Sequence, residues 1–235
     1  MTRKLLVVAA SGLVLAILLL SAAWVVGGRS MMATFHHGGW HFSDDDDDHA
    51  PTVTHTIAFD PGAPLTLDAP VEVHFVRGDR AAMTVSGAAP LVSAMRWQNN
   101  RLSINDGPMF WHHALHVEIV APRLPPLTLA GPGNVSIEKL DQDDLQLNLR
   151  GAGNVNASGK VRAVTVSNSG AGNVDLSELD ATDATVTASG IGNVDLAASG
   201  KVTVLLSGVG NVSLHRKPAE LTSRINGIGS IDQDY

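Results

Sequence analysis

Apolar and polar residues alternate along most of the chain from residue 51 to residue 235. In the second half the alternation comes in paired runs, such as Val202, Val204 and Leu206 followed by Val212 and Leu214. A period of two residues indicates a strand with one buried face. Residues 51–130 alternate less regularly, at Val71, Val73 and Phe75, Met83 and Val85, Leu102 and Ile104, and Leu115, Val117 and Ile119. The pattern therefore predicts strands throughout residues 51–235.

A five-residue phrase, Gly-x-Gly-Asn-Val, separates the paired runs. Its first glycines are 20, 19, 20, 18 and 19 residues apart, and the last copy has drifted to Gly-Ile-Gly-Ser-Ile. A fixed period of this length predicts a solenoid in residues 131–235, with one coil per phrase. The repeated glycines and asparagines are Gly131, Gly133, Asn134, Gly151, Gly153, Asn154, Gly170, Gly172, Asn173, Gly190, Gly192, Asn193, Gly208, Gly210, Asn211, Gly227 and Gly229.

The period also limits what one coil can contain. About 19 residues cannot hold a helix of ten or more residues beside two strands, so the prediction is all-β. A leucine-rich repeat is the alternative, but its Leu-x-x-Leu-x-Leu signature is absent and its period of roughly 20–29 residues is mostly longer. Each coil should consist of a strand, a Gly-x-Gly-Asn corner, a second strand and a short return.

The repeated residues are expected to serve the backbone. Glycine permits positive φ and close backbone approach at a corner, and asparagine stabilises turns through its own side chain. Stacked asparagines would form an amide ladder along the coils, with the amides of Asn173 and Asn193 buried between neighbours. A role for these asparagines as ligands is the alternative.

The six phrases behind alternating strands resemble the bacterial head GIN domain family, the head domains of auto-transporter adhesins. The resemblance covers roughly residues 51 to 235 and includes Ala121-Pro122-Arg123-Leu124 before the first phrase. It implies an all-β, right-handed β-helix-like domain outside the cytoplasm. It implies neither catalytic residues nor a cofactor.

Residues 1–28 carry the pattern of a membrane segment. Arg3 and Lys4 precede an uncharged run, and residues 5–26 would span about 33 Å as a helix, enough for a bilayer core of about 30 Å. The positive flank predicts that the amino terminus is inside and the rest exported. A signal peptide cleaved near Ser21-Ala22-Ala23 is the alternative, which would give a secreted protein.

Residues 29–50 read as a tether that joins this segment to the head. Five aspartates, Asp44 to Asp48, repel one another, so a solvated spacer is expected. Four histidines, His36, His37, His41 and His49, flank the aspartates, and a loose divalent-metal site is the alternative. In the first half of the head, residues 51–130, the loop Met109–His113 is interpreted as a flap over the open end of the solenoid, or else as a ligand-contacting tip.

Charge and motifs exclude several classes of function. The formal net charge of −7 argues against a nucleic-acid partner. No phosphate loop, nucleophile elbow or zinc spacing occurs. One enzymatic hypothesis remains, because Asp175 and Asp195 occupy equivalent places in adjacent coils, near the carboxyl separation of retaining glycosidases. A solvated polar column on the outer face, or a weak cation site, accounts better for these two aspartates.

The sequence thus predicts a non-catalytic, adhesin-like binding head, anchored as a single pass in the bacterial inner membrane with the head outside the cytoplasm. An envelope glycan or an envelope protein is the expected partner, and neither a cofactor nor a metal is expected. The alternative is a structural or sensory component of the cell envelope that acts through a membrane partner.

Overall fold

The structure, a computed structural model, describes residues 51–104 and 114–235. The expected anchor (1–28), tether (29–50) and most of the loop preceding residue 114, including Met109–His113, lie outside the described residues. Within the described ranges, no helix is both long and apolar enough to cross a membrane. The anchor therefore stays a prediction.

In its described residues, the first half of the head contains eight strands and one short helix. They are β1 (Thr52–Ile57), β2 (Leu65–Asp68), β3 (Val71–Arg77), β4 (Ala82–Ala88), α2 (Ala89–Ala94), β5 (Met95–Gln98), β6 (Arg101–Ile104), β7 (Leu115–Ala121) and β8 (Leu127–Leu129). The helix was not expected from the period-two pattern. Pro90 lies in its first turn, where a proline is tolerated because the N–H it lacks has no partner within a helix.

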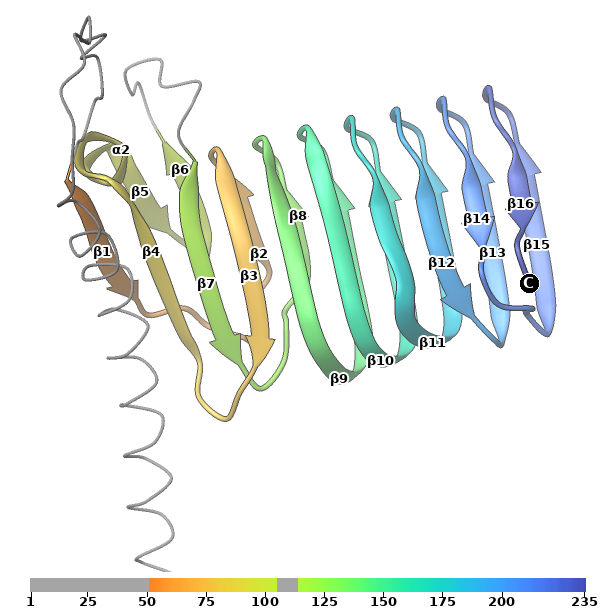
Figure 1. Ribbon diagram of the computed structural model, residues 1–235, viewed down its shortest axis with the longest axis horizontal. Helices are drawn as coiled ribbons and strands as arrows, with labels where there is room; N and C mark the ends of the chain where they lie inside the picture. Colours follow the sequence, from red (N-terminus) through yellow and green to blue (C-terminus); the bar gives the residue numbers. More distant parts are fainter. Residues whose placement is uncertain (1–50, 105–113) are drawn as a thin grey trace, which may run out of the picture. The chain divides into compact units, whose positions relative to one another are not determined.

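The repeat region consists of longer strands followed by shorter ones. They are β9 (Gly133–Leu149), β10 (Gly153–Asn168), β11 (Val174–Ala188), β12 (Val194–Ala198), β13 (Lys201–Leu206), β14 (Val212–Leu214), β15 (Glu220–Ile225) and β16 (Ile231–Gln233). The glycine corners separate these strands at one end of the stack, and bends lie at the opposite end (Figure 1). In β9, β10 and β11 the strand continues through its bend. The half between the glycine corner and the bend lies in what is here called the first layer, and the half after the bend lies in the second layer.

Parallel pairing joins each coil to the next in register. Val155 pairs with Val174, Val174 with Val194, and Val194 with Val212 in the first layer. In the second layer Val166 pairs with Val186, and Val186 with Val204. The predicted all-β solenoid is confirmed and makes about five turns. Its right-handed sense, which the family resemblance implied, stays a prediction.

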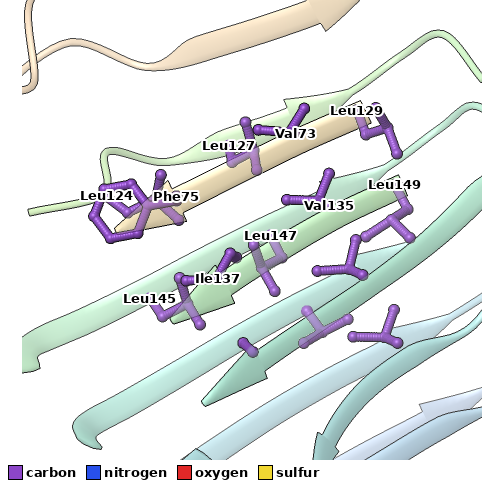
Figure 2. Close-up of a cluster of buried hydrophobic side chains, with 14 of the residues drawn as sticks. Val73, Phe75, Leu124, Leu127, Leu129, Val135, Ile137, Leu145, Leu147 and Leu149 are labelled. Atoms are coloured by element: carbon purple, nitrogen blue, oxygen red, sulfur yellow. The ribbon is translucent and has the colours of Figure 1, made fainter. Parts of the chain in front are cut away.

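The alternating apolar residues of both layers meet in one core. Figure 2 shows Val135 and Ile137 from the first half of β9 lying toward Leu145, Leu147 and Leu149 from its second half. All five side chains are at most 3 % exposed. A single cluster of buried residues extends from Phe59 to Leu214 and therefore includes both halves of the head.

The first half extends the same sheet, but its strands are not arranged in space in the order in which they occur along the chain. β3 lies between β7 and β9 and pairs in parallel with both, although β7 follows β3 in the sequence (Figure 1). β1 and β4 then add antiparallel strands beyond β7, and β5 adds one beyond β6. The amino-terminal end of the core is covered by β1, β5 and α2, whose Leu91 and Val92 are buried.

Candidate functional site

Each glycine corner brings the backbones of successive coils into close contact. A Cβ on Gly153 would lie 1.6 Å from the carbonyl oxygen of Gly133, and one on Gly192 would lie 1.9 Å from that of Gly172. Gly192 also has a φ of +139°, which residues with side chains rarely adopt. A Cβ would meet another atom within 2.4 Å at the other corner glycines too: Gly131, Gly133, Gly151, Gly170, Gly172, Gly190, Gly208, Gly210, Gly227 and Gly229. The repeated glycines therefore serve coil stacking.

The five asparagines Asn134, Asn154, Asn173, Asn193 and Asn211, here called the asparagine column, follow the corners in register. Their side-chain oxygens accept backbone N–H groups from the next coil, as in Asn193 N to Asn173 Oδ1 (2.9 Å) and Asn211 N to Asn193 Oδ1 (3.0 Å). Amide-to-amide bonds join Asn154 to Asn134 (3.1 Å) and Asn173 to Asn154 (3.2 Å). All five residues are exposed, so the expectation that Asn173 and Asn193 would be buried is wrong.

The exposure has a geometric cause. Val135, Val155 and the equivalent valines point into the core, and the residue before each valine must then point to solvent. The asparagine column is thus a surface ladder, in which side chains bond mainly to the backbone of the neighbouring coil.

Asp175 and Asp195 pair in register on β11 and β12, on the outer face of the first layer. Asn156 lies beside Asp175 in the preceding coil, and Ser213 lies beside Asp195 in the following coil. The structure therefore places the two aspartates at adjacent, paired positions of an outward column, where the sequence predicted them.

Each aspartate has a different partner on this face. Asp175 Oδ1 accepts hydrogen bonds from Ser177 Oγ (2.6 Å) and from the Ser177 N–H (3.0 Å). These bonds, with a smaller contribution from the charge of His215, hold the pKa of Asp175 below its ordinary value despite partial burial. Asp195 Oδ1 lies 3.2 Å from His215 Nε2.

This group of side chains does not form a recognisable reaction centre. The Ser177 hydroxyl donates to Asp175, so the described geometry does not couple a serine nucleophile to the His215 base. No set of three or more His, Asp or Glu side chains in residues 51–104 and 114–235 is arranged to hold a metal ion. What the group offers is a polar, hydrogen-bonding surface.

A second column of polar residues lies on the outer face of the second layer. Thr165, Thr185, Thr203 and Thr222, here called the threonine column, pair in register across β10, β11, β13 and β15. Gln146 continues the column onto β9. A parallel column two residues further along consists of Asn148, Ser167, Thr187 and Leu205. From β9 to β13 these two columns contain hydroxyl and amide groups, the apolar Leu205 and no charged side chain, whereas the next outward positions toward the bends carry Asp144, Asp183 and Lys201.

Sequence reasoning missed His215, Ser177 and the threonine column. The threonines carried a usable signal, because Thr165, Thr185, Thr203 and Thr222 are 20, 18 and 19 residues apart and so follow the spacing of the phrases. His215 carried none, since no other coil has a histidine at the equivalent place.

Comparison with known proteins identifies relatives of this architecture. A family model described as "Putative auto-transporter adhesin, head GIN domain" matches residues 63–218. No curated protein matches the chain.

Among solved structures, a "putative adhesin" from Bacteroides fragilis is similar at 17 % identity and a TM-score of 0.63, covering 78 % of this chain and 97 % of that one. A "putative lipid binding protein" from Parabacteroides distasonis has 17 % identity, 79 % and 97 % coverage, and a TM-score of 0.42. At this identity the Bacteroides fragilis structure supports the fold alone, and the lower score of the other indicates a looser superposition.

Proposed function

The chain belongs to the head GIN domain family, and from that premise we propose that it is a non-catalytic, adhesin-like binding head. Its binding surface is the outer face of the second layer, centred on the threonine column. Its partner is a hydroxyl-rich or amide-rich envelope polymer, either a glycan or a protein.

The uncharged character of the threonine column and of the column beside it carries the proposal. Outward residues on exposed sheet surfaces are commonly charged, since charges prevent unwanted association. Here the threonine column and the column beside it bear hydroxyl or amide groups across β9, β10, β11 and β13, with Leu205 the one apolar member. Charged side chains on this face begin nearer the bends, at Asp144, Asp183 and Lys201. Such a surface can exchange hydrogen bonds with a neutral polymer along several coils, and many weak contacts then add up.

A non-catalytic role agrees with the geometry of the other face. Asp175 and Asp195 are engaged by Ser177 and His215, and they lie on an open sheet surface. Catalytic groups work best in sites that exclude water, because charge interactions are weakened in solvent. The proposal therefore assigns these residues to the polar surface of the first layer.

The proposed location is outside the cytoplasm, with the chain anchored by residues 5–26. The motivation is the length of the apolar run and the positive flank at Arg3 and Lys4. Amino-terminal sequencing of membrane-extracted protein checks this proposal: the mature protein should begin at or near Met1. A mature start near Trp24 would show a cleaved signal peptide instead.

The binding proposal is tested with the full-length chain in a non-ionic detergent. The immobilised protein is incubated with purified envelope polysaccharide and, separately, with envelope proteins from a producing cell. We expect retention of one of these fractions. Thr185→Lys should abolish retention, because it places a long, strongly hydrated cation in the centre of the threonine column.

A matched variant provides the control. Asn156→Lys introduces the same side chain at an exposed position of the first layer, which faces away from the proposed surface, and it should leave retention unchanged. Loss of retention in both variants, or in neither, would contradict the assignment to the second layer. Failure of the unaltered chain to retain either fraction would contradict the binding role itself.

A further inference from the structure

We propose that the bend of the second repeat coil holds a small-molecule site for a zwitterion, a ligand that carries an ammonium group and a carboxylate or phosphate. The site is a groove with a volume of about 510 Å³, lined by Asp141, Gln142 and Asp143 from β9, Lys160, Val161 and Arg162 from β10, and Asp180 and Thr182 from β11. Here it is called the bend groove. Its volume is in the range of ligand sites in proteins.

The bend groove exists because one coil is shorter than its neighbours. Between the pairs Ala157–Ile137 and Gly159–Leu140, β10 has one residue where β9 has two. On the other side, between Asn156 and Gly159, β10 is again one residue shorter than β11. The phrase spacing records the same difference, since this coil has 19 residues and each adjacent coil has 20.

Local backbone geometry fits this shortening. Gly159 closes the tight bend with a φ of +126°, and a Cβ there would lie 2.3 Å from the Leu140 carbonyl oxygen. The longer bend of β9 accommodates its extra residue with Lys139 in the left-handed region, at a φ of +56°. The bend of β10 is therefore recessed between two longer bends, with Lys160, Val161 and Arg162 as its floor.

Charges alternate across the groove. Lys160 pairs in register with Asp141 on one side and with Asp180 on the other. Both aspartates are bound from outside the groove, Asp141 by Arg77 (2.7 Å) and Asp180 by Arg216. Among residues 51–104 and 114–235, no carboxylate lies within 4.0 Å of the Lys160 ammonium. Lys160 is thus the cation best able to bind an oxyanion.

Asp143 is the complementary acidic group. Its nearest cation is the Arg162 Nε, at 4.0 Å, whereas Arg162 donates a closer hydrogen bond of 3.0 Å to Asp144, which does not line the groove. The Asp143 carboxylate is also highly exposed. It can therefore accept hydrogen bonds from a ligand ammonium.

The balance of charges selects the ligand class. Three aspartates and two cations line the groove, and Arg77 and Arg216 bind two of these aspartates from outside it, so both signs of charge are present side by side. A lone anion or a lone cation gains little from a surrounding of mixed charge, because attraction to one group is offset by repulsion from the next. A molecule with both charges can place its oxyanion near Lys160 and its ammonium near Asp143, so that both contacts are favourable.

This site is separate from the threonine column, because it lies on the bends and not on the outer face of a layer. The proposed binding surface and the bend groove can therefore be tested independently, and a negative result for one proposal does not contradict the other.

The test is a calorimetric titration of the full-length chain in a maltoside detergent, at low ionic strength, since exposed charges are screened by salt. The probes are O-phosphoethanolamine, a lipid headgroup, and glycylglycine, a free peptide zwitterion. Inorganic phosphate and ethanolamine, which each carry half of the charge pattern, are the comparison probes. We expect saturable binding of at least one zwitterion, about tenfold tighter than that of either comparison probe.

Two variants remove one half of the site each, and one variant is the control. Lys160→Gln and Asp143→Asn should each weaken zwitterion binding by about tenfold, because each removes one charge-assisted contact. Lys217→Gln removes the same charge as Lys160→Gln from an exposed position on the bend of another coil, and binding should stay within about twofold of the unaltered protein. Urea midpoints of all three variants confirm that the fold persists.

The outcomes separate clearly. Binding of O-phosphoethanolamine alone supports a phosphate headgroup as the ligand source, and binding of glycylglycine supports an amino acid or peptide. Phosphate binding as tightly as the zwitterions would overturn the proposal in favour of a simple anion site. Absence of saturable binding, or an equal loss in Lys217→Gln, would also overturn it.

Discussion

Single residues at the corners determine whether the coils can stack. Asn168 is an example that the glycine pattern did not indicate: it is the one buried polar residue within the described ranges. Its Nδ2 donates to the Gly172 carbonyl oxygen (3.0 Å), and its Oδ1 accepts from the Gly170 N–H (3.2 Å). A buried amide needs such partners, because an unsatisfied polar group in the core is costly. Asn168 therefore holds its corner from inside the core.

The first prediction at this scale concerns Gly192. Replacing Gly192 with alanine should lower the free energy of unfolding by about 2–4 kcal/mol, because the new methyl group meets the Gly172 carbonyl and the backbone has a positive φ. Gly62→Ala is the control, since the nearest atom to its Cβ is the end of the Asp60 side chain at 3.1 Å. Urea unfolding measures both variants, and an equal effect of the two would contradict the role of coil contact.

The second prediction concerns the titration of Asp175. Because its folded pKa lies below the ordinary value of 3.8, the stability it contributes is present above that pH and is lost as the pH falls through the folded pKa. Ser177→Ala removes the hydroxyl donor, so the pKa of Asp175 should rise toward 3.8. Carboxyl NMR titration reads the pKa directly. An unchanged value in the variant would mean that the Ser177 hydroxyl does not cause the shift.

At the scale of elements, the two layers of the solenoid have different outer surfaces. The outer face of the first layer carries the asparagine column, Asp175, Asp195 and three histidine–carboxylate pairs: His116–Glu72 (3.0 Å), His74–Glu138 (3.3 Å) and His215–Asp195 (3.2 Å). The second layer carries the hydroxyls and amides of the threonine column and of the column beside it, with Asp144, Asp183 and Lys201 nearer the bends. Because both layers share one core, these surfaces can differ without any change in packing, which leaves each face able to meet a different partner.

The third prediction compares two neighbouring positions of the first layer. Asn193→Val removes the acceptor of the Asn211 N–H and should cost about 1 kcal/mol, at the low end for a lost hydrogen bond because the site is exposed. Asp195→Ser loses only a partly exposed contact with His215 and should cost less than about 0.5 kcal/mol. Urea midpoints give the order. If Asp195→Ser proves the more damaging variant, the aspartate has a role beyond the surface column.

At the scale of the whole head, the two halves share one sheet and one core. β3 makes the connection, because it pairs with β7 on one side and with β9 on the other. Phe75 on β3 is fully buried in the cluster that reaches the last coils. A continuous core of this kind favours cooperative unfolding of both halves together.

The fourth prediction tests this cooperativity. Phe75→Ala should lower the free energy of unfolding by about 3–5 kcal/mol, as expected for removing a large buried side chain. The loss should appear equally in amide hydrogen exchange of Val73 in the first half and Val155 in the repeats. Two separate transitions, with only the first half destabilised, would show that the halves fold independently.

The repeat architecture could be predicted from the sequence because it depends on local, periodic features. The alternation of apolar residues determined which side chains enter the core, and the phrase spacing determined that coils stack in parallel. Glycine and asparagine at fixed intervals located the corners. The resemblance to the head GIN domain family extended this prediction to the first half.

Other features were decided only by the tertiary structure, because they depend on contacts between distant residues. Nothing local indicates that β3 lies between β7 and β9, or that Asp195 meets His215. The bend groove is of the same kind: a spacing of 19 between spacings of 20 is visible in the sequence, yet the recess exists only where the short bend of β10 is stacked between two longer ones. Periodicity determines how one coil is built, whereas stacking determines which side chains share a surface.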